Sequence, residues 1–210
     1  MPDNLTTALR LVLVTDDDLV AGRDLGVLAR AAVAGGVTAI QLRLKRTDPR
    51  QLMRILLQLR DSVSVPLFIN DRPDIAAAAG VGVHLGPEDL SPASARLVLG
   101  PSAVIGASVG SAAEVEGGQA ADYWGIGPWR TTPTKSDAGA ALGAAEFATL
   151  AGFAGSRPRI AIGGVRPEDA AEIVAAGGTG IAVASGILGA RDIGRASRSY
   201  ADAIAAALSS

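Results

Sequence analysis

Eight short apolar runs alternate with alanine- and leucine-rich stretches along the chain, and this alternation constrains the fold more than any other feature. Runs of four or five residues rich in β-branched side chains, bounded by glycine or polar turns, predict buried strands. The expected strands are Leu11–Thr15, Ala39–Leu42, Leu67–Asn70, Gly82–Leu85, Val104–Ser108, Tyr123–Ile126, Arg159–Ile162 and Gly180–Ala184. The expected helices are Arg23–Ala34, Pro49–Ser62, Pro73–Ala79, Pro92–Leu97, Ala112–Gln119, Ala144–Ala151, Pro167–Ala176 and Arg191–Leu208.

Strict alternation of strands and helices indicates a parallel sheet, because each strand needs a crossover before the next parallel strand can begin. Eight such units within 210 residues predict an α/β protein with a single (β/α)₈ (TIM) barrel, forming one domain over residues 1–210. The alternative is a doubly wound open sheet, which normally has fewer strands and one nucleotide-binding crevice.

Composition excludes several classes of function. The net charge of −2 and the lack of a basic tract argue against nucleic acid as a partner. The absence of cysteine excludes disulfides, thiolate metal sites and a cysteine nucleophile, and the one histidine, His84, cannot form a multi-histidine metal site. The uncharged stretch 173–190 is long enough for a membrane helix, but its glycines favour helix end, strand and loop. We therefore expect a cytoplasmic protein with no membrane partner. The sequence leaves open whether the protein assembles into a homo-oligomer.

Only two lysines occur beside seventeen arginines, and both fall in segments that resemble ligand-binding loops. Lys45 closes the segment Gln41-Leu42-Arg43-Leu44-Lys45, and Lys135 closes Thr132-Pro133-Thr134-Lys135. A compact ammonium group suits a phosphate oxygen as a point charge. The alternative is that each lysine is simply solvated.

Polar residues follow most of the predicted strands, and in a TIM barrel the strand C-termini form one functional ring. The ring residues are Gln41, Arg43, Lys45, Asn70, Asp71, Asp89, Ser108, Thr132, Thr134 and Lys135. Alternation along an extended segment places Gln41, Arg43 and Lys45 on one side, where they can face one ligand. The last two strands lead into Gly163-Gly164 and Ala184-Ser185-Gly186, whose backbone N–H groups can bind a phosphate.

Asp71 and Asp89 are the best candidates for a magnesium pair, because Mg²⁺ commonly binds one or two carboxylates and substrate phosphate oxygens. Either residue alone could instead cap a helix or a turn. Arg43, Lys45 and Lys135 would then neutralise the charge that grows on a departing diphosphate. For Arg43 the alternative is a surface salt bridge.

Three other features have simpler interpretations. His84 ends an apolar strand and is expected to be hydrogen-bonded within the fold rather than catalytic. Asp16-Asp17-Asp18 is interpreted as a turn and helix start rather than a metal run. Trp124 and Trp129 are expected to pack the barrel end.

The stretch 129–141 is long enough to form a mobile lid that excludes water.

Taken in order, these motifs resemble the thiamine phosphate synthase family over nearly the whole chain. The motifs are Val14-Thr15-Asp16, Gln41-Leu42-Arg43-Leu44-Lys45, Ile69-Asn70-Asp71-Arg72, Val83-His84-Leu85-Gly86 with Glu88-Asp89, Ile105-Gly106-Ala107-Ser108, Gly127-Pro128 with Thr132-Pro133-Thr134-Lys135, Ala161-Ile162-Gly163-Gly164 and Val183-Ala184-Ser185. The resemblance implies a transferase that joins the pyrimidine and thiazole halves of thiamine, acting on small phosphorylated heterocycles.

The resemblance also implies roles for individual residues. The pyrimidine diphosphate ligands are implied to be Gln41, Arg43, Lys45, Asn70, Ser108 and Lys135, with Arg43, Lys45, Ser108 and Lys135 catalytic. Mg²⁺ is implied on Asp71 and Asp89, and the thiazole phosphate on Thr132, Thr134, Gly164, Ala184 and Ser185. Diphosphate would leave the pyrimidine methylene as a cation forms, and the thiazole nitrogen would attack without needing a general base.

Several positions depart from the family pattern. Pro87 stands where glutamine is frequent, Val12 where tyrosine is common, and Trp129-Arg130 where smaller apolar residues are usual. Gly110 stands where the similar thiazole tautomerases have a histidine regarded as their acid/base, which argues against tautomerase activity. A tautomerase-like isomerase and a non-catalytic relative that binds thiamine precursors are the two alternative functions.

Overall fold

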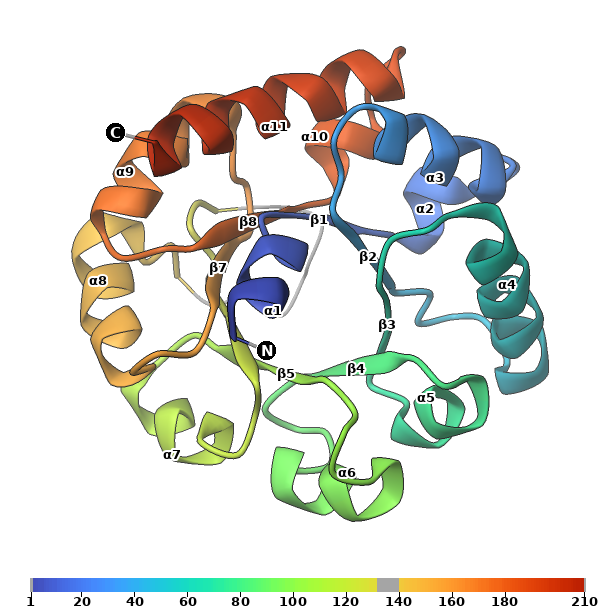
Figure 1. Cartoon of the computed structure of the whole chain (residues 1–210), viewed down its shortest axis with the longest axis horizontal. Coiled ribbons are helices and arrows are strands. Elements are labelled where there is room, and N and C mark those ends of the chain that lie inside the picture. The colour runs from blue at the N-terminus through green and yellow to red at the C-terminus, as the bar shows by residue number, and fades with distance from the viewer. Residues whose placement is uncertain (1, 132–139, 210) are drawn as a thin grey trace.

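The computed structural model describes residues 2–131 and 140–209 and forms a closed barrel of eight parallel strands (Figure 1). Each strand pairs with the next in sequence, and β8 closes the barrel against β1. The strands are β1 Leu11–Val14, β2 Ala39–Leu42, β3 Leu67–Asn70, β4 Gly82–Leu85, β5 Ile105–Val109, β6 Tyr123–Ile126, β7 Arg159–Ile162 and β8 Gly180–Val183. The predicted (β/α)₈ barrel is confirmed, and the open-sheet alternative is wrong.

Helices surround the barrel in one layer, except α1, which lies across one end of it (Figure 1). They are α1 Pro2–Ala8, α2 Asp17–Val20, α3 Leu25–Ala34, α4 Pro49–Ser62, α5 Pro73–Ala79, α6 Pro92–Leu99, α7 Val115–Gly118, α8 Gly143–Phe153, α9 Ala170–Ala175, α10 Ser185–Leu188 and α11 Ile193–Leu208, with 3₁₀ turns η1 Ala112–Glu114 and η2 Pro167–Asp169. The sequence did not predict α1 and α10, and it indicated only the start of α2, because these short helices lack the long apolar periodicity that makes larger helices recognisable.

Helix starts follow the expected capping chemistry. Asp48 accepts a hydrogen bond from the Gln51 N–H, and Pro49 takes the first helical position of α4. Ser91 caps α6 in the same way, because its hydroxyl accepts the Ser94 N–H. Such caps satisfy donors that the first helical turn leaves unpaired.

The barrel interior is filled at the end where the strands begin. Phe68 and Tyr123 are buried there and meet edge to face, with ring centroids 5.5 Å apart. Their rings fill space left by glycine, since a Cβ built at Gly82 or Gly106 would overlap Phe68 or Tyr123, respectively. Helix α1 lies across this end, where Leu5 packs on the interior cluster (Figure 1). A ligand must therefore enter from the opposite end.

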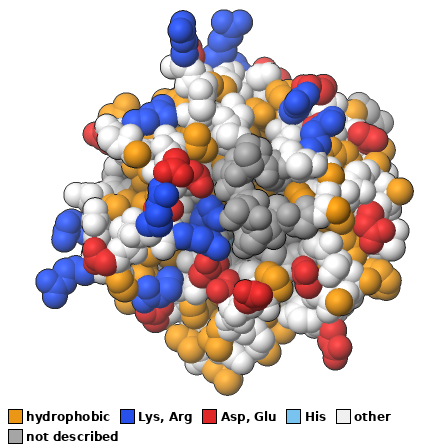
Figure 2. Space-filling model, turned by 180° about the vertical axis from the view of Figure 1, so that it is seen from behind, with side chains coloured by type: hydrophobic (Ala, Val, Ile, Leu, Met, Phe, Trp, Pro, Cys, Tyr) orange, Lys and Arg blue, Asp and Glu red, His pale blue; other side chains and the backbone are white. Residues whose placement is uncertain are grey.

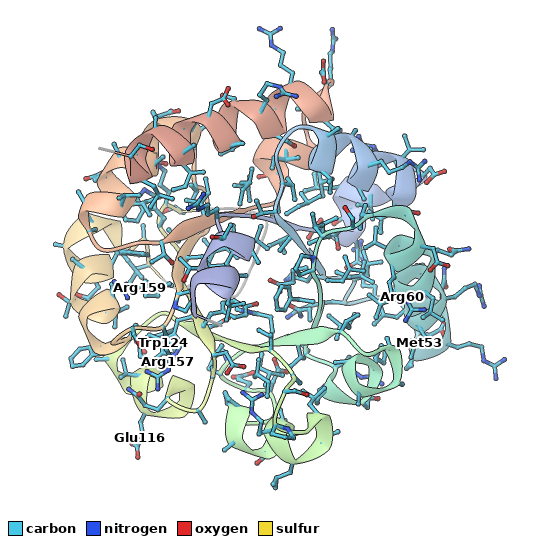
Figure 3. The ribbon with its side chains drawn as sticks, viewed as in Figure 1. Met53, Arg60, Glu116, Trp124, Arg157 and Arg159 are labelled. Carbon is cyan, nitrogen blue, oxygen red and sulfur yellow. The ribbon has the colours of Figure 1, made fainter. Side chains whose placement is uncertain are left out.

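Arginine side chains hold loops together near the start of β7. Arg157 lies over the Trp124 ring, 5.8 Å from its centroid, and donates to backbone carbonyls of residues 119, 121 and 154. Arg159 donates to the carbonyls of residues 155, 157 and 177. Figure 3 labels Trp124, Arg157 and Arg159, which lie on the same side of the barrel. Trp124 is fully buried, as its predicted packing role requires.

Among the helices of the described residues, none combines the length and the apolar character needed to span a membrane.

The tight fit of Tyr123 against Gly106 generates a stability prediction. We expect Gly106→Ala to lower the free energy of unfolding by about 1–3 kcal/mol, because the added methyl would force the Tyr123 ring out of its position. Chemical denaturation measures this change.

Gly117→Ala in α7 is the control, since a Cβ there meets nothing within 4 Å and alanine favours the helix. Equal stability of the Gly106→Ala variant and the unmodified protein would contradict the packing account.

Candidate active site

A cavity of about 420 Å³ opens at the end of the barrel opposite α1. Its walls come from strand ends and the loops that follow them, including Thr15, Arg43, Ser108, Glu114, Gly127, Leu142, Gly163, Gly164, Ala184, Ser185 and Gly186. Figure 2 views the molecule from this side and shows Lys and Arg side chains beside acidic ones near the middle of the face. This cavity thus lies at the predicted ring position, at the strand C-termini.

Arg43 is held at the cavity wall by the loop after β1. The Thr15 hydroxyl accepts the Arg43 N–H at 2.8 Å and donates to the Arg43 carbonyl at 3.2 Å. The guanidinium lies 3.3 Å from the Asp16 carboxylate, and both side chains are only 15% exposed. Arg43 thus forms a salt bridge, with Asp16, as the alternative interpretation expected. It also lines the cavity.

The acidic run after β1 organises the next loop. Asp16 caps α2, which confirms the interpretation of this run as a helix start. Asp17 accepts the backbone N–H groups of Lys45, at 2.9 Å, and of Arg46, at 3.3 Å. The sequence reading missed this second role, because nothing local to Asp17 indicates which neighbouring loop it will meet.

Gln41, Arg43 and Lys45 were predicted to share one face, and the structure divides them over neighbouring surfaces. Arg43 lines the large cavity, whereas Lys45 lines an adjacent hollow of about 190 Å³ together with Asn70 and Asp71. Gln41 is buried deeper and donates its amide to the Asn70 side-chain oxygen at 2.7 Å. This bond fixes the Asn70 side chain beside the hollow.

Asp71 and Asp89 come together although they follow different strands. The Asp89 carboxylate accepts the Gly86 N–H at 2.7 Å, which aims it across the β4 loop. Burial, followed by a hydrogen bond and charge repulsion from Asp89, raises the Asp71 pKa from 3.8 to about 6, while Lys45 and Arg43 oppose the rise. Lys45 Nζ lies 3.9 Å from Asp71 Oδ2.

The backbone at Asp71 has a left-handed conformation, with φ of +64°. Helix α5 has Arg72 at its N-cap, without a side-chain hydrogen bond, so Asp71 does not serve as the cap. Aspartate tolerates this conformation better than most residues, yet it remains unusual outside glycine. Uncommon backbone conformations of this kind cluster at positions where a side chain must face a ligand.

The facing carboxylates fit a divalent cation, because a cation would relieve the repulsion that raises the Asp71 pKa. Among the described residues, no group of three or more histidine or acidic side chains forms a metal cluster. The two carboxylates would therefore need further oxygen ligands, of the kind that a phosphorylated substrate offers.

Ser108 is reached by a chain of hydrogen bonds through the barrel interior. The Tyr123 hydroxyl lies 3.0 Å from His84 Nδ1, and His84 Nε2 lies 3.0 Å from Ser108 Oγ. His84 is thus hydrogen-bonded within the fold, as expected. Because Ser108 also lines the cavity, this chain fixes the position of a hydroxyl in the cavity wall.

The last two strands end in turns that present backbone to the cavity. Gly163 and Gly164 have φ values of +91° and +66°, which glycine adopts without strain. Helix α10 begins at Ser185, and the first N–H groups of a helix have no acceptor within it. Gly164, Ala184 and Ser185 all line the cavity, so these turns can receive an anion.

Three predicted site residues, Thr132, Thr134 and Lys135, lie outside the described residues, as does most of the stretch 129–141 interpreted as a lid. Trp129 at its start is buried and packs edge to face on Phe147, which confirms the packing interpretation. Glu114, which accepts the Gly110 N–H at 2.7 Å, lines the cavity and was missed. Its place in the loop that follows β5, the strand of Ser108, was the only signal available.

The raised Asp71 pKa generates a pH prediction. Asp71 binds its proton more tightly in the folded protein than in the unfolded chain, so its contribution to stability falls as pH rises from 3.8 to about 6. With a chelator present, the stability of the unmodified protein relative to Asp71→Asn should therefore decrease across this window. Denaturation at a series of pH values measures the difference.

Asparagine tolerates the left-handed conformation at position 71, so the substitution changes charge rather than backbone. Added Mg²⁺ at neutral pH should raise the melting temperature of the unmodified protein more than that of Asp71→Asn. A pH-independent difference between the two proteins would show that Asp71 does not titrate as described.

Comparison with known proteins gives a consistent result. The family model described as thiamine monophosphate synthase matches residues 11–187. The chain is 47% identical over 196 residues to the thiamine-phosphate synthase of Azorhizobium caulinodans, covering 90% of this chain and 92% of the relative. It is 44% identical over 205 residues to that of Xanthobacter autotrophicus, covering 95% and 97%. The solved thiamine phosphate pyrophosphorylase from Pyrococcus furiosus superposes with a TM-score of 0.85 at 32% identity, covering 98% of this chain and 100% of that one.

Proposed function

The chain belongs to the thiamine monophosphate synthase family. We propose that it joins a pyrimidine diphosphate to a thiazole phosphate in the cavity at the C-terminal ends of the strands. The relatives place the chain among the transferases. The products are thiamine phosphate and diphosphate. The observation that carries the proposal is the meeting of Asp71, Asp89 and Lys45 beside the Arg43 wall of the cavity.

Cationic and polar side chains bind the diphosphate in this proposal. Arg43 and Lys45 offer fixed positive charge, and Ser108 offers a hydroxyl that His84 orients. Gln41 and Asn70 form a hydrogen-bonded pair that borders the pyrimidine. Lys135 completes the set as a prediction from the sequence alone. Preorganised charge stabilises the leaving diphosphate, since the groups need no rearrangement as its charge develops.

Asp71 and Asp89 are the residues that would hold Mg²⁺. Bound there, the ion would supply Lewis-acid stabilisation of the diphosphate oxygens.

The thiazole binds through its phosphate on the opposite side of the cavity. The turns at Gly164 and at Ala184-Ser185 offer backbone N–H groups to the phosphate, and Thr132 and Thr134 are predicted to join them. The thiazole nitrogen then attacks the pyrimidine methylene with its lone pair. That nitrogen carries no proton, so the bond forms without a general base, in keeping with the internally bonded His84.

Tautomerase activity is disfavoured by the backbone at Gly110. A Cβ built there would lie 2.8 Å from the Gly127 carbonyl oxygen, so a histidine would require the backbone to move. A non-catalytic binding protein is the remaining alternative. A cytoplasmic location and assembly into a homo-oligomer stay predictions.

The direct experiment mixes purified protein with the pyrimidine diphosphate and the thiazole phosphate and quantifies thiamine phosphate, with Mg²⁺ or with a chelator. We expect product only with Mg²⁺. Tight diphosphate binding without product would favour the non-catalytic alternative, and product undiminished by the chelator would contradict the metal assignment.

Two arginines of the β2 loop provide a matched test of the site. Arg43→Gln should lower kcat/KM by about two to three orders of magnitude, because it removes a charge that faces the diphosphate. Arg46→Gln should change it by less than about threefold, because Arg46 pairs with Asp18 at the exposed surface. Steady-state kinetics and melting temperatures separate catalysis from folding, and equal losses in the two variants would disprove the assignment of Arg43.

A further inference from the structure

Asp169 joins two loops beside the phosphate-binding turn. Its side chain is 2% exposed, at the end of η2 after β7, and it accepts both Arg130 Nε, at 3.0 Å, and Arg130 Nη2. It also accepts the Arg166 N–H at 2.8 Å. Burial raises the Asp169 pKa, but hydrogen bonds from Arg130, the Arg166 backbone and Trp129 together hold it below its ordinary value. Asp169 is therefore a buried anion bonded to the β6 loop and to its own loop.

The backbone of the same β6 loop lies directly on the glycine turn. The Trp129 N–H donates to the Ile162 carbonyl at 2.7 Å, and the Arg130 N–H donates to the Gly163 carbonyl at 2.9 Å. A Cβ built at Gly164 would lie 2.9 Å from Arg130 Cβ. The Arg130 backbone thus fixes the Gly163 carbonyl, and its Cβ leaves room at position 164 only for glycine.

Fixing one carbonyl also fixes the following N–H. In a trans peptide the C=O of one residue and the N–H of the next point in opposite directions. Since the Gly163 carbonyl points to Arg130 in the β6 loop, the Gly164 N–H points the other way, towards β8. Ala184 and Ser185 line the cavity on that side, so donors from both turns can meet one anion.

We propose that Asp169, through Arg130, is a positioning residue for the thiazole phosphate: it holds the β6 loop so that the Gly164 N–H faces the phosphate. This inference rests on the proposed function and extends it to residues that touch no substrate. It also accounts for Arg130, which departs from the apolar residue usual at its position. In this chain the ion pair of Arg130 with Asp169 holds the β6 loop beside the glycine turn.

A structural role alone is the competing explanation, because removing one partner of a buried ion pair is strongly destabilising. Asp122 provides the control. It accepts the Arg96 guanidinium at 2.8 Å and the Ile105 N–H at 2.7 Å, and it precedes β6 at the end of the barrel remote from the cavity. Asp169 and Asp122 thus each accept one arginine and one backbone N–H at opposite ends of the barrel, although the Asp122 side chain is more exposed, at 36%.

The test compares Asp169→Asn with Asp122→Asn. Both should lower the melting temperature. Only Asp169→Asn should raise the KM for the thiazole phosphate, by about tenfold for one weakened hydrogen bond to a charged group, with the KM for the pyrimidine diphosphate unchanged. An equal KM change in both variants, or none in Asp169→Asn, overturns the proposal.

Arg130→Met tests the same contact if Asp169→Asn does not fold, because methionine keeps the aliphatic part of the side chain and removes the guanidinium. Arg130→Met should raise the KM for the thiazole phosphate, and Arg130→Lys should raise it less. A normal KM for thiazole phosphate in folded Arg130→Met overturns the proposal.

Calorimetric binding of inorganic phosphate and of thiazole phosphate separates this inference from the proposed function. The positioning role would be supported, and the proposed function would fail, if the unmodified protein binds phosphate but forms no product. In that case Asp169→Asn should lose the phosphate binding and Asp122→Asn should keep it. Normal turnover together with unchanged phosphate binding in Asp169→Asn would refute the positioning role alone.

Discussion

Closure of the parallel barrel is the constraint on which the rest of this structure depends. Pairing of β8 with β1 brings eight loops into one ring, so residues far apart in sequence become neighbours at the strand ends. The interior is filled from the other end, by Phe68 and Tyr123 packed against glycines and by α1. The open space that remains, about 420 Å³, lies where the ring of polar side chains is. Packing at one end thus determines the site at the other.

Acidic side chains hold two pairs of neighbouring loops of the ring together. Asp16 and Asp17 bind the loop after β2, and Asp169 binds the loop after β6. Because these carboxylates bond backbone N–H groups or arginine, they fix the loops without occupying the cavity. A site that works by stabilising developing charge benefits from such rigidity, since its donors are in place before the charge appears.

Opposing charges meet at the site. Asp71 has its proton affinity raised by burial and by Asp89, while Lys45 and Arg43 lower it. The site is thus poised to accept a cation and an anion together, which suits a metal-bound diphosphate. Histidine has no part in this balance, because the bonds of His84 to Tyr123 and Ser108 lie along the barrel interior.

The sequence by itself determined the strand order and most helix limits, because periodicity, proline and capping residues act over a few positions. It also predicted the polar ring, three members of which lie outside the described residues. Strand ends were predicted within one residue; β5, for example, runs from Ile105 to Val109 rather than from Val104 to Ser108. Only the tertiary structure decided which ring members meet: that Asp71 faces Asp89, that Gln41 turns inward to Asn70, and that Arg130 closes on Asp169. These contacts join different loops, and their partners depend on barrel closure and on backbone conformations such as the left-handed turn at Asp71, which no local pattern encodes.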